Sequence, residues 1–346
     1  MKKLRVLVLM HEDLMPPVET DGLCEDEVPP WKTEYDILWA LDELGHNVRP
    51  IGVNADLGAL RGAIDSFDPD VVFNVLEEFH GATCYGQALV SYLELERRAY
   101  TGCNPRGLVL AHDKVLTKQI LSYHDINTPR FELFRRGRAI KPTEKLRYPL
   151  MVKSSFEDAS LGISQKSVVN TERQLRERIE FMMETFDTDV IVEEYIEGRE
   201  LYLGIIGNER LETFPVWEMS FNKWPAGKAR IATEKVKWNY AYQVKHDIQT
   251  GPAEISDEVR RNIEQLGKRV YRTLGLSGYA RLDLRLTAEG EVWLIEANGN
   301  PDLAHDEDFA KSALAAGVEY PALIQKILKL GRAWKPAWKE AAEALA

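Results

Sequence analysis

The first hundred residues alternate between strand-like and helix-like hydrophobic patterns. Apolar runs at residues 4–10 (LRVLVLM) and 71–75 (VVFNV) are typical of strands buried on both faces of a sheet, and residues 48–53 are also strand-like. Apolar side chains recur at helical spacing in residues 35–44, 57–67 and 88–97. This βαβαβα order predicts a parallel sheet with right-handed crossovers. No GxGxxG follows the first strand, so a nicotinamide site is not indicated.

The pattern changes after the turn-rich residues 101–105, which mark a predicted domain boundary. Helices are predicted at residues 113–123, 172–184, 256–274 and 320–330, the third with Ser256 as its N-cap. Short strands are predicted at residues 150–153, 190–196, 201–206, 211–216, 279–286 and 291–296. Residues 221–250 are polar and aromatic without a clear period, which in a compact domain indicates a functional loop or lid.

Composition narrows the class of protein. A chain of 346 residues with 45% hydrophobic residues is long enough for about two domains and is not disordered. Its 44 Lys and Arg against 55 Asp and Glu give a net charge of −11, which argues against a general nucleic-acid binder. Three cysteines without CxxC spacing suit a reducing compartment. No apolar stretch approaches the ~20 residues that span a bilayer, so we expect a cytoplasmic protein with no membrane partner.

Polar side chains of the last two predicted strands indicate a metal site. Strand alternation puts Arg281, Asp283 and Arg285 on one face, and Glu296 and Asn298 also share a face. If the two strands pair as a hairpin, Asp283, Glu296 and Asn298 converge. Carboxylate and amide oxygens suit Mg²⁺, which takes its other ligands from water and phosphates. An ordinary solvated strand face with salt bridges is the alternative interpretation.

Lysines elsewhere in the chain suggest phosphate contacts. Lys153 ends a predicted strand and is followed by residues 154–162 (SSFEDASLG), whose small residues offer free backbone N–H groups. Lys114, early in its helix, is a second candidate cation, although either lysine alone is more often a solvated surface charge. Residues 190–196 end in a tight turn where Glu200 could bind ribose hydroxyls, with a plain β-hairpin as the alternative.

These features, in this order, resemble the ATP-grasp superfamily, and most closely its D-alanine–D-alanine ligase branch. The resemblance runs from about Asp70 to Leu330. The residues that carry it are Val71 to Asn74, His80-Gly81, Tyr100 to Gly102, Asp113-Lys114, Tyr148 to Lys153, Ser160 to Gly162, Glu193 to Ile196, Gly198 to Glu200, Gly278 to Asp283 and Glu296 to Asn298.

The resemblance implies an α/β fold, α+β in its C-terminal lobes, in which ATP binds between two lobes. The implied units are an N-terminal Rossmann-like domain (1–106), a central ATP-grasp lobe (107–204), a C-terminal ATP-grasp lobe (205–332) and a tail (333–346). It also implies ATP with two Mg²⁺ ions, or Mn²⁺, as cofactors, small amino-acid or related carboxylate and amine substrates, and the family's usual homodimer.

The resemblance assigns roles to individual residues. Lys114 and Lys153 would contact phosphates, Ser160 and Gly162 would form the closing loop, and Lys237 would act from the long central loop, with Lys235 as its alternative. Arg281 would stabilise the acyl phosphate and the tetrahedral intermediate. The other implied contacts are Glu193, Glu194, Tyr195 and Ile196 around adenine, Glu200 at the ribose, Asp283, Glu296 and Asn298 at the metals, and His80, Asn300 and Asp302 at the amino-acid substrates.

The implied reaction joins a carboxylate to an amine through an acyl phosphate. Catalysis then needs positioning and charge neutralisation, together with a lid that excludes water. The residues that would bind the nucleotide match the family pattern, whereas those that would bind the amino acids depart from it. Residues 10–17 lack the family's glycines, and Asn300-Pro301-Asp302 replaces Ser-Pro-Gly. The prediction therefore extends to the ligase reaction and not to D-alanine as its substrate. The alternatives are a nucleotide-binding protein without ligase activity, an ATP-dependent kinase, and a peptide-extending ligase.

Overall fold

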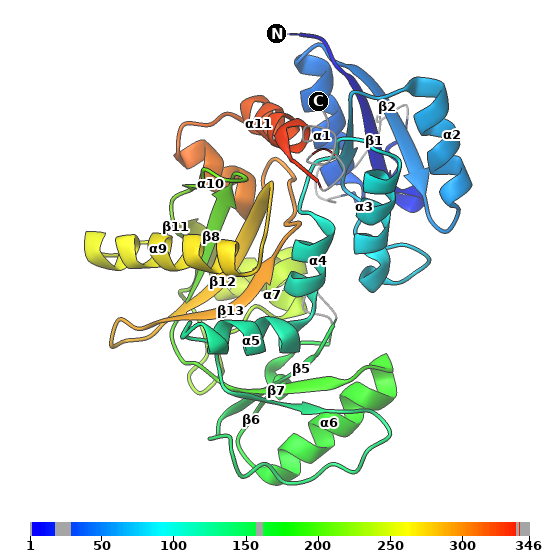
Figure 1. Ribbon diagram of the computed structural model, residues 1–346. Helices are drawn as coiled ribbons and strands as arrows, with labels where there is room; N and C mark the ends of the chain where they lie inside the picture. Colours follow the sequence, from blue (N-terminus) through cyan, green and yellow to red (C-terminus); the bar gives the residue numbers. More distant parts are fainter. Residues whose placement is uncertain (1, 18–28, 157–161, 337–338, 340–346) are drawn as a thin grey trace.

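The computed structural model describes residues 2–17, 29–156, 162–336 and 339 (Figure 1). Its N-terminal part is a three-stranded parallel sheet in the order β2-β1-β3. The central strand β1 is buried on both faces, as its apolar run predicts. Val6, Val8 and Met10 pack on one side of the sheet, and Leu7 and Leu9 on the other. The elements are β1 (Arg5–His11), α1 (Lys32–Glu43), β2 (Asn47–Val53), α2 (Leu57–Phe67), β3 (Val71–Asn74) and α3 (Gly86–Leu95).

Two short helices then lead away from this sheet. The backbone N–H of Gly107 donates to Asn104 Oδ1 (3.0 Å), which caps α4 (Pro105–His112). The backbone N–H of Leu116 donates to Asp113 Oδ1 (2.8 Å) at the start of α5 (Lys114–Tyr123). Residues 101–105 were predicted only as a boundary, and α4 was not predicted, although Asn-Pro is a helix-start signal.

A small antiparallel sheet follows, in the order β4-β7-β5-β6, and it packs against one long helix. The predicted strands here were confirmed, but the sequence analysis missed the two edge strands, which are short. The elements are β4 (Phe131–Phe134), β5 (Leu150–Ser154), β6 (Val168–Val169), α6 (Glu172–Phe186) and β7 (Val190–Glu194).

The larger sheet has the order β11-β10-β8-β12-β13, with β9 paired to β8. The predicted strand at 211–216 is confirmed only over the two residues of β9, and the next strand begins at Trp217. The predicted boundary at residue 204 falls within β8, which pairs along its length with β12. The strands are β8 (Arg199–Ile206), β9 (Glu212–Thr213), β10 (Trp217–Phe221), β11 (Ile248–Pro252), β12 (Tyr279–Leu286) and β13 (Val292–Asn298).

Helices complete this part of the molecule. The backbone N–H of Val259 donates to Ser256 Oγ, which confirms the predicted cap of α9. The segment without a clear period contains two short helices, because its polar and aromatic residues mask the helical spacing. The helices are α7 (Glu234–Trp238), α8 (Tyr240–His246), α9 (Asp257–Thr273), α10 (Asp308–Ala315) and α11 (Tyr320–Ala333), with 3-10 turns η1 (Glu12–Leu14), η2 (Thr83–Tyr85) and η3 (Gln165–Ser167).

The C-terminal helices connect the larger sheet back to the N-terminal one. Residues of α11 such as Leu323 and Ile324 share a core with Ile37 and Leu41 of α1, and Figure 1 shows α11 beside α1. The segment between β13 and α11 is therefore held between the two parts of the molecule. Within the described residues, no helix has both the length and the apolar character that a bilayer crossing requires.

Candidate active site

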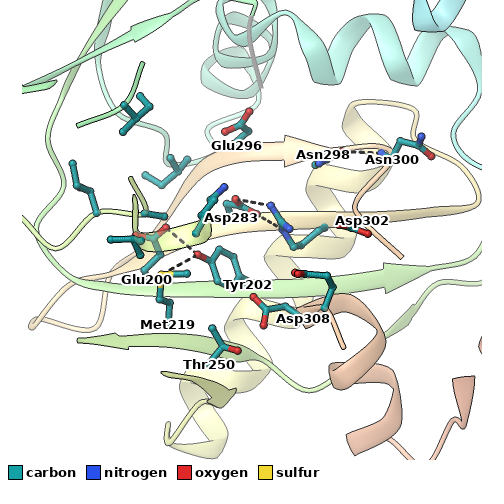
Figure 2. A pocket seen from close by; sticks show the side chains of 18 of the residues that line it. Glu200, Tyr202, Met219, Thr250, Asp283, Glu296, Asn298, Asn300, Asp302 and Asp308 are labelled. Atoms are coloured by element: carbon teal, nitrogen blue, oxygen red, sulfur yellow. Dashed lines mark hydrogen bonds and ion pairs between the residues drawn. The ribbon is translucent and has the colours of Figure 1, made fainter. Parts of the chain in front are cut away.

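A cleft of about 940 Å³ lies between the small sheet and the larger sheet, with α4 and α5 at its side. The structure brings most of the sequence-predicted site residues to this one cleft (Figure 2). Those that line it are Lys114, Lys153, Glu193, Glu194, Tyr195, Ile196, Glu200, Lys237, Arg281, Asp283, Glu296, Asn298, Asn300 and Asp302.

The hairpin of β12 and β13 positions the acidic residues as the sequence predicted. Asp283 lies directly opposite Glu296 in the antiparallel pairing, and Arg281 lies opposite Asn298. The pairing shifts by one residue just after Asp283, so Ile295 is an extra residue in β13. This bulge matters because regular alternation would put Glu296 on the same face as the buried Leu294. The bulge turns Glu296 and Asn298 towards the cleft.

Arg281 and Asp283 form a two-pronged ion pair within β12. Arg281 Nε donates to Asp283 Oδ1 (2.8 Å) and Nη2 donates to Asp283 Oδ2 (3.2 Å). The guanidinium also lies over the ring of Tyr202, 5.2 Å from its centroid. Burial disfavours the charged guanidinium, but Asp283 outweighs burial and raises the pKa of Arg281, with a contribution from Asp308. Arg281 is therefore a fixed positive charge in the cleft.

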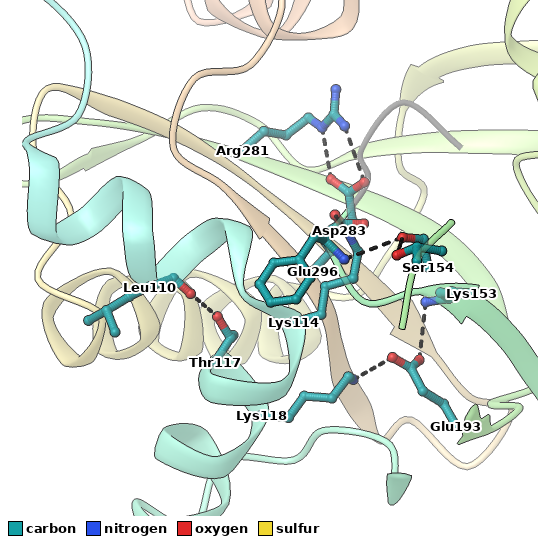
Figure 3. A network of polar contacts seen from close by, with 12 residues as sticks. Leu110, Lys114, Thr117, Lys118, Lys153, Ser154, Glu193, Arg281, Asp283 and Glu296 are labelled. Atoms are coloured by element: carbon teal, nitrogen blue, oxygen red, sulfur yellow. Dashed lines mark hydrogen bonds and ion pairs between the residues drawn. The ribbon is translucent and has the colours of Figure 1, made fainter. Parts of the chain in front are cut away.

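Cations from other elements contact the remaining carboxylates (Figure 3). Lys114 Nζ lies 3.0 Å from Glu296 Oε1. The buried Glu193 lies between two lysines, with Lys153 Nζ 3.1 Å from its Oε2 and Lys118 Nζ 3.3 Å from its Oε1. Burial raises the pKa of Glu193, but the two lysines outweigh burial and lower it. Burial also lowers the pKa of Lys118 to about 8, against the opposing effect of Glu193.

Glu200, which also lines the cleft, is fixed by an arginine. Arg285 Nη2 donates to Glu200 Oε2 (2.7 Å) and to the carbonyl oxygen of Arg230 (2.7 Å), and its Nη1 donates to the carbonyl oxygen of Gly198 (2.9 Å). One side chain thus joins β12, the turn before β8 and the long segment that precedes α7. This leaves the Glu200 carboxylate beside the cleft in one orientation.

Some sequence-predicted residues are not brought to the cleft. His80 is exposed on the turn of residues 79–82, with a positive φ of 55°, and lies outside the lining, so the predicted substrate contact is not supported. Gly162 also lies outside the lining, because it packs against Phe186 of α6. Of the two candidate lysines in the long segment, Lys237 lines the cleft and Lys235 does not. Ser160 lies outside the described residues.

The sequence analysis missed Lys118, the buried partner of Glu193. Its signal was available: Lys118 stands four residues after Lys114 in a helix, so the two share one face. It also missed Tyr202, which reads as an ordinary core residue because it lies in an apolar strand. The position of Tyr202 at the cleft becomes visible only in the folded structure, where its ring lies under the Arg281 guanidinium.

The oxygen donors in the cleft fit a hard divalent cation. In the part of the chain that the structure describes, no three His, Cys, Asp or Glu side chains come together as a metal-binding group. The candidate metal ligands are therefore two carboxylates, Asp283 and Glu296, with the amide of Asn298. Such a set suits Mg²⁺, which keeps several waters and completes its coordination with substrate phosphates.

The class of protein follows from fold and cleft together. The chain is similar in structure to the D-alanine–D-alanine ligase from Bacillus anthracis complexed with ATP, with a TM-score of 0.72 and 22% sequence identity, over 95% of this chain and 97% of that one. The fold is thus the ATP-grasp fold, with a nucleotide-sized cleft between two antiparallel sheets.

Sequence comparison identifies the family. A family profile described as D-ala D-ala ligase C-terminus matches residues 120–329. The chain is 30% identical to the uncharacterized protein y4sG of Sinorhizobium fredii, over 84% of this chain and 85% of that protein. It is also 30% identical to the D-alanine–D-alanine ligase of Geobacter sulfurreducens, over 84% and 86%. The chain belongs to the D-alanine–D-alanine ligase family, and it is an ATP-dependent ligase that forms an amide bond.

Proposed function

We propose that the chain joins a small carboxylic acid to an amine, with ATP converted to ADP and phosphate through an acyl-phosphate intermediate. One observation carries this proposal: cations from three elements, Lys114, Lys153 and Arg281, line the same cleft as the Asp283–Glu296 carboxylate pair. Phosphoryl transfer requires mainly positioning and charge neutralisation, and this arrangement supplies both.

The lysines would bind the phosphates and the β7 segment would bind the base. Lys153 and Lys114 lie within ion-pair distance of carboxylates on opposite sides of the cleft, so phosphate oxygens would compete for cations that are already positioned. Residues 193–196 would face adenine, and Glu200, held by Arg285, would accept ribose hydroxyls. Lys237, on α7, would reach the phosphates from the lid side. We also propose a role for Ser160 in the closing loop.

Asp283, Glu296 and Asn298 would hold Mg²⁺. When bound, the metal neutralises charge on the phosphates. Arg281 would stabilise the negative charge that develops on the acyl carbonyl oxygen, because its guanidinium is fixed by Asp283 and cannot turn away. Water would hydrolyse an acyl phosphate, so residues 221–250, which contribute Ile231, Val236 and Tyr240 to the lining, would close over it.

The division of the chain is also a proposal. We place the N-terminal domain at residues 1–106, as the sequence predicts. The pairing of β8 with β12 supports a boundary between the central and C-terminal lobes near residue 198, in place of 204. The C-terminal lobe would then extend to residue 332, followed by the tail.

The test is ATP-dependent amide formation. The purified full-length protein is incubated with ATP, Mg²⁺ and paired amino acids and small amines, including D-isomers, and released phosphate and product mass are measured. We expect phosphate release with at least one pair, and a product whose mass is that of an amide. A phosphoester product would favour the kinase alternative. Background turnover with every pair, in a protein that binds nucleotide, would contradict the proposal.

A further inference from the structure

A second group of charged residues lies in the same cleft, in the segment that follows β13. Asp302, Asp306, Glu307 and Asp308 all line it. Asp308 contributes to the raised pKa of Arg281, so this segment adjoins the guanidinium. Figure 2 shows Asp302 and Asp308 beyond the hairpin carboxylates, where the chain leads into α10. The acidic segment therefore borders the cleft on the side of Arg281.

A smaller cavity of about 320 Å³ adjoins the cleft at this point, and Thr33, Asn300 and Asp302 line both. It is also lined by Glu34, in the first turn of α1, whose side chain is only 3% exposed. Among the described residues, Glu34 Oε2 has no hydrogen-bond partner. A buried carboxylate oxygen without a donor is costly, and it marks a place where a ligand donor fits.

The charges around Asp302 are not balanced. Burial raises the pKa of Glu34 to about 7, and Asp302 adds to that effect. Burial also raises the pKa of Glu307 to about 7, with contributions from Asp302, Asp308 and Asp306. Asp302 is thus the acidic neighbour that both groups share. Asp302 Oδ1 accepts hydrogen bonds from Thr33 Oγ1 (2.7 Å) and from the backbone N–H of Ala304 (2.9 Å), which are both uncharged donors. Among the described residues, no lysine or arginine forms an ion pair with Asp302.

The nearby lysines do not neutralise this group. Lys32 Nζ is bound to Asp36 (2.6 Å) and Asp306 (2.9 Å), at the edge of the cluster. Lys311 lowers the pKa of Asp306 and opposes the rise in the pKa of Glu307, which nevertheless remains raised. In the described part of the chain, no three of these acidic side chains come together as a metal-binding group. An organic cation, which is larger and donates several hydrogen bonds, suits carboxylates spread around a cavity.

We propose that the amine substrate of this ligase carries a second cationic group, which Asp302 binds together with Glu34 and Glu307. This inference rests on the proposed function and names its acceptor as a diamine-like molecule. The acidic segment is then the specificity determinant of the acceptor site.

The chemistry of such an acceptor is balanced. One nitrogen, as the free amine, attacks the acyl carbon and forms the C–N bond. The C–O bond to the phosphate breaks, and phosphate leaves with the electron pair and takes up the proton lost from nitrogen. The other nitrogen stays protonated among the carboxylates throughout, so it positions the attacking end and does not react.

Binding of matched four-carbon amines tests this inference without the unknown acid substrate. The full-length protein is saturated with Mg²⁺ and β,γ-imido-ATP and titrated calorimetrically with 1,4-diaminobutane, butylamine and 4-aminobutanoate. These differ only at the far end, which is an ammonium, a methyl or a carboxylate. We expect 1,4-diaminobutane to bind at least about tenfold more tightly than the other two. We expect Glu307→Gln and Asp302→Asn to weaken the binding of 1,4-diaminobutane by about tenfold and to leave the binding of butylamine unchanged.

The control is Glu319→Gln. Glu319 precedes α11 as Glu307 precedes α10, and neither side chain makes a capping hydrogen bond, but Glu319 is exposed and lies outside the cleft. Equal or tighter binding of 4-aminobutanoate would overturn the inference, as would no binding of 1,4-diaminobutane, or unchanged binding in both acidic variants whose nucleotide affinity is intact. The proposed function fails separately, when no substrate pair releases phosphate.

Discussion

Asp283 and Glu296 face each other across β12 and β13, yet each is held by a cation from a different element. Arg281 of the same strand binds Asp283, and Lys114 of α5 binds Glu296. Carboxylate oxygens are hard ligands that suit Mg²⁺, and here each carboxylate already has a positively charged partner. On nucleotide binding, Lys114 would leave Glu296 and bind the phosphates, and Glu296 would bind the metal.

Glu296→Gln tests this exchange. The amide keeps the size of the side chain but removes the charge that would bind Mg²⁺ and position Lys114. We expect kcat for phosphate release to fall by about 10²–10³-fold, and the Mg²⁺ concentration at half-maximal rate to rise. Glu291→Gln, at the exposed far end of the same hairpin, should leave both unchanged. An unaltered Mg²⁺ dependence in Glu296→Gln would contradict the assignment.

Lys118→Met tests the buried pair below the phosphate site. Glu193 would keep Lys153 but lose its second cation, and a buried charge with less compensation costs stability. We expect the free energy of unfolding to fall by about 3 kcal/mol, measured by urea denaturation. Lys145→Met, on an exposed residue, should change it by less than about 0.5 kcal/mol. Equal midpoints for the two variants would show that Lys118 does not support Glu193.

Glu34→Gln should stabilise the protein, and only at the higher pH values. The folded-state pKa of Glu34 is raised to about 7 from 4.5, so between these pH values the folded protein retains a proton that the unfolded chain has lost. Stability from this group therefore decreases as pH rises through that window. Glutamine removes the effect, so we expect a gain of about 2 kcal/mol at pH 8 and none below pH 4.5. A pH-independent difference in thermal unfolding would contradict this.

The fold could be predicted where hydrophobic spacing is strong. The apolar run of β1, the helical spacing of α2 and the alternation in β12 each correspond to elements at the predicted residues. Short elements such as β6 and α7 were missed, because two to five residues carry no measurable period. Their positions depend on pairing with neighbours that are distant in sequence.

The site was predictable where its chemistry lies on one strand or hairpin. Asp283 and Glu296 were found because alternation fixes which side chains share a face. The sequence could not indicate that a bulge at Ile295 was needed to turn Glu296 out of the core. It also could not identify Glu34 as a residue of the smaller cavity, since α1 and the segment after β13 are brought together only by tertiary packing.

Arg285→Lys separates nucleotide positioning from chemistry. Arg285 makes three hydrogen bonds, to Glu200 and to the carbonyl oxygens of Gly198 and Arg230, in a fork that lysine cannot reproduce. Because Glu200 would bind ribose and not the reacting phosphate, a loosened Glu200 should weaken ATP binding. We expect KM for ATP to rise by about tenfold, with kcat within about threefold of the original value. Arg272→Lys, on the exposed face of α9, is the matched control and should change neither constant. A fall in kcat at unchanged KM would place Arg285 in the chemical step and would move the ribose site away from Glu200.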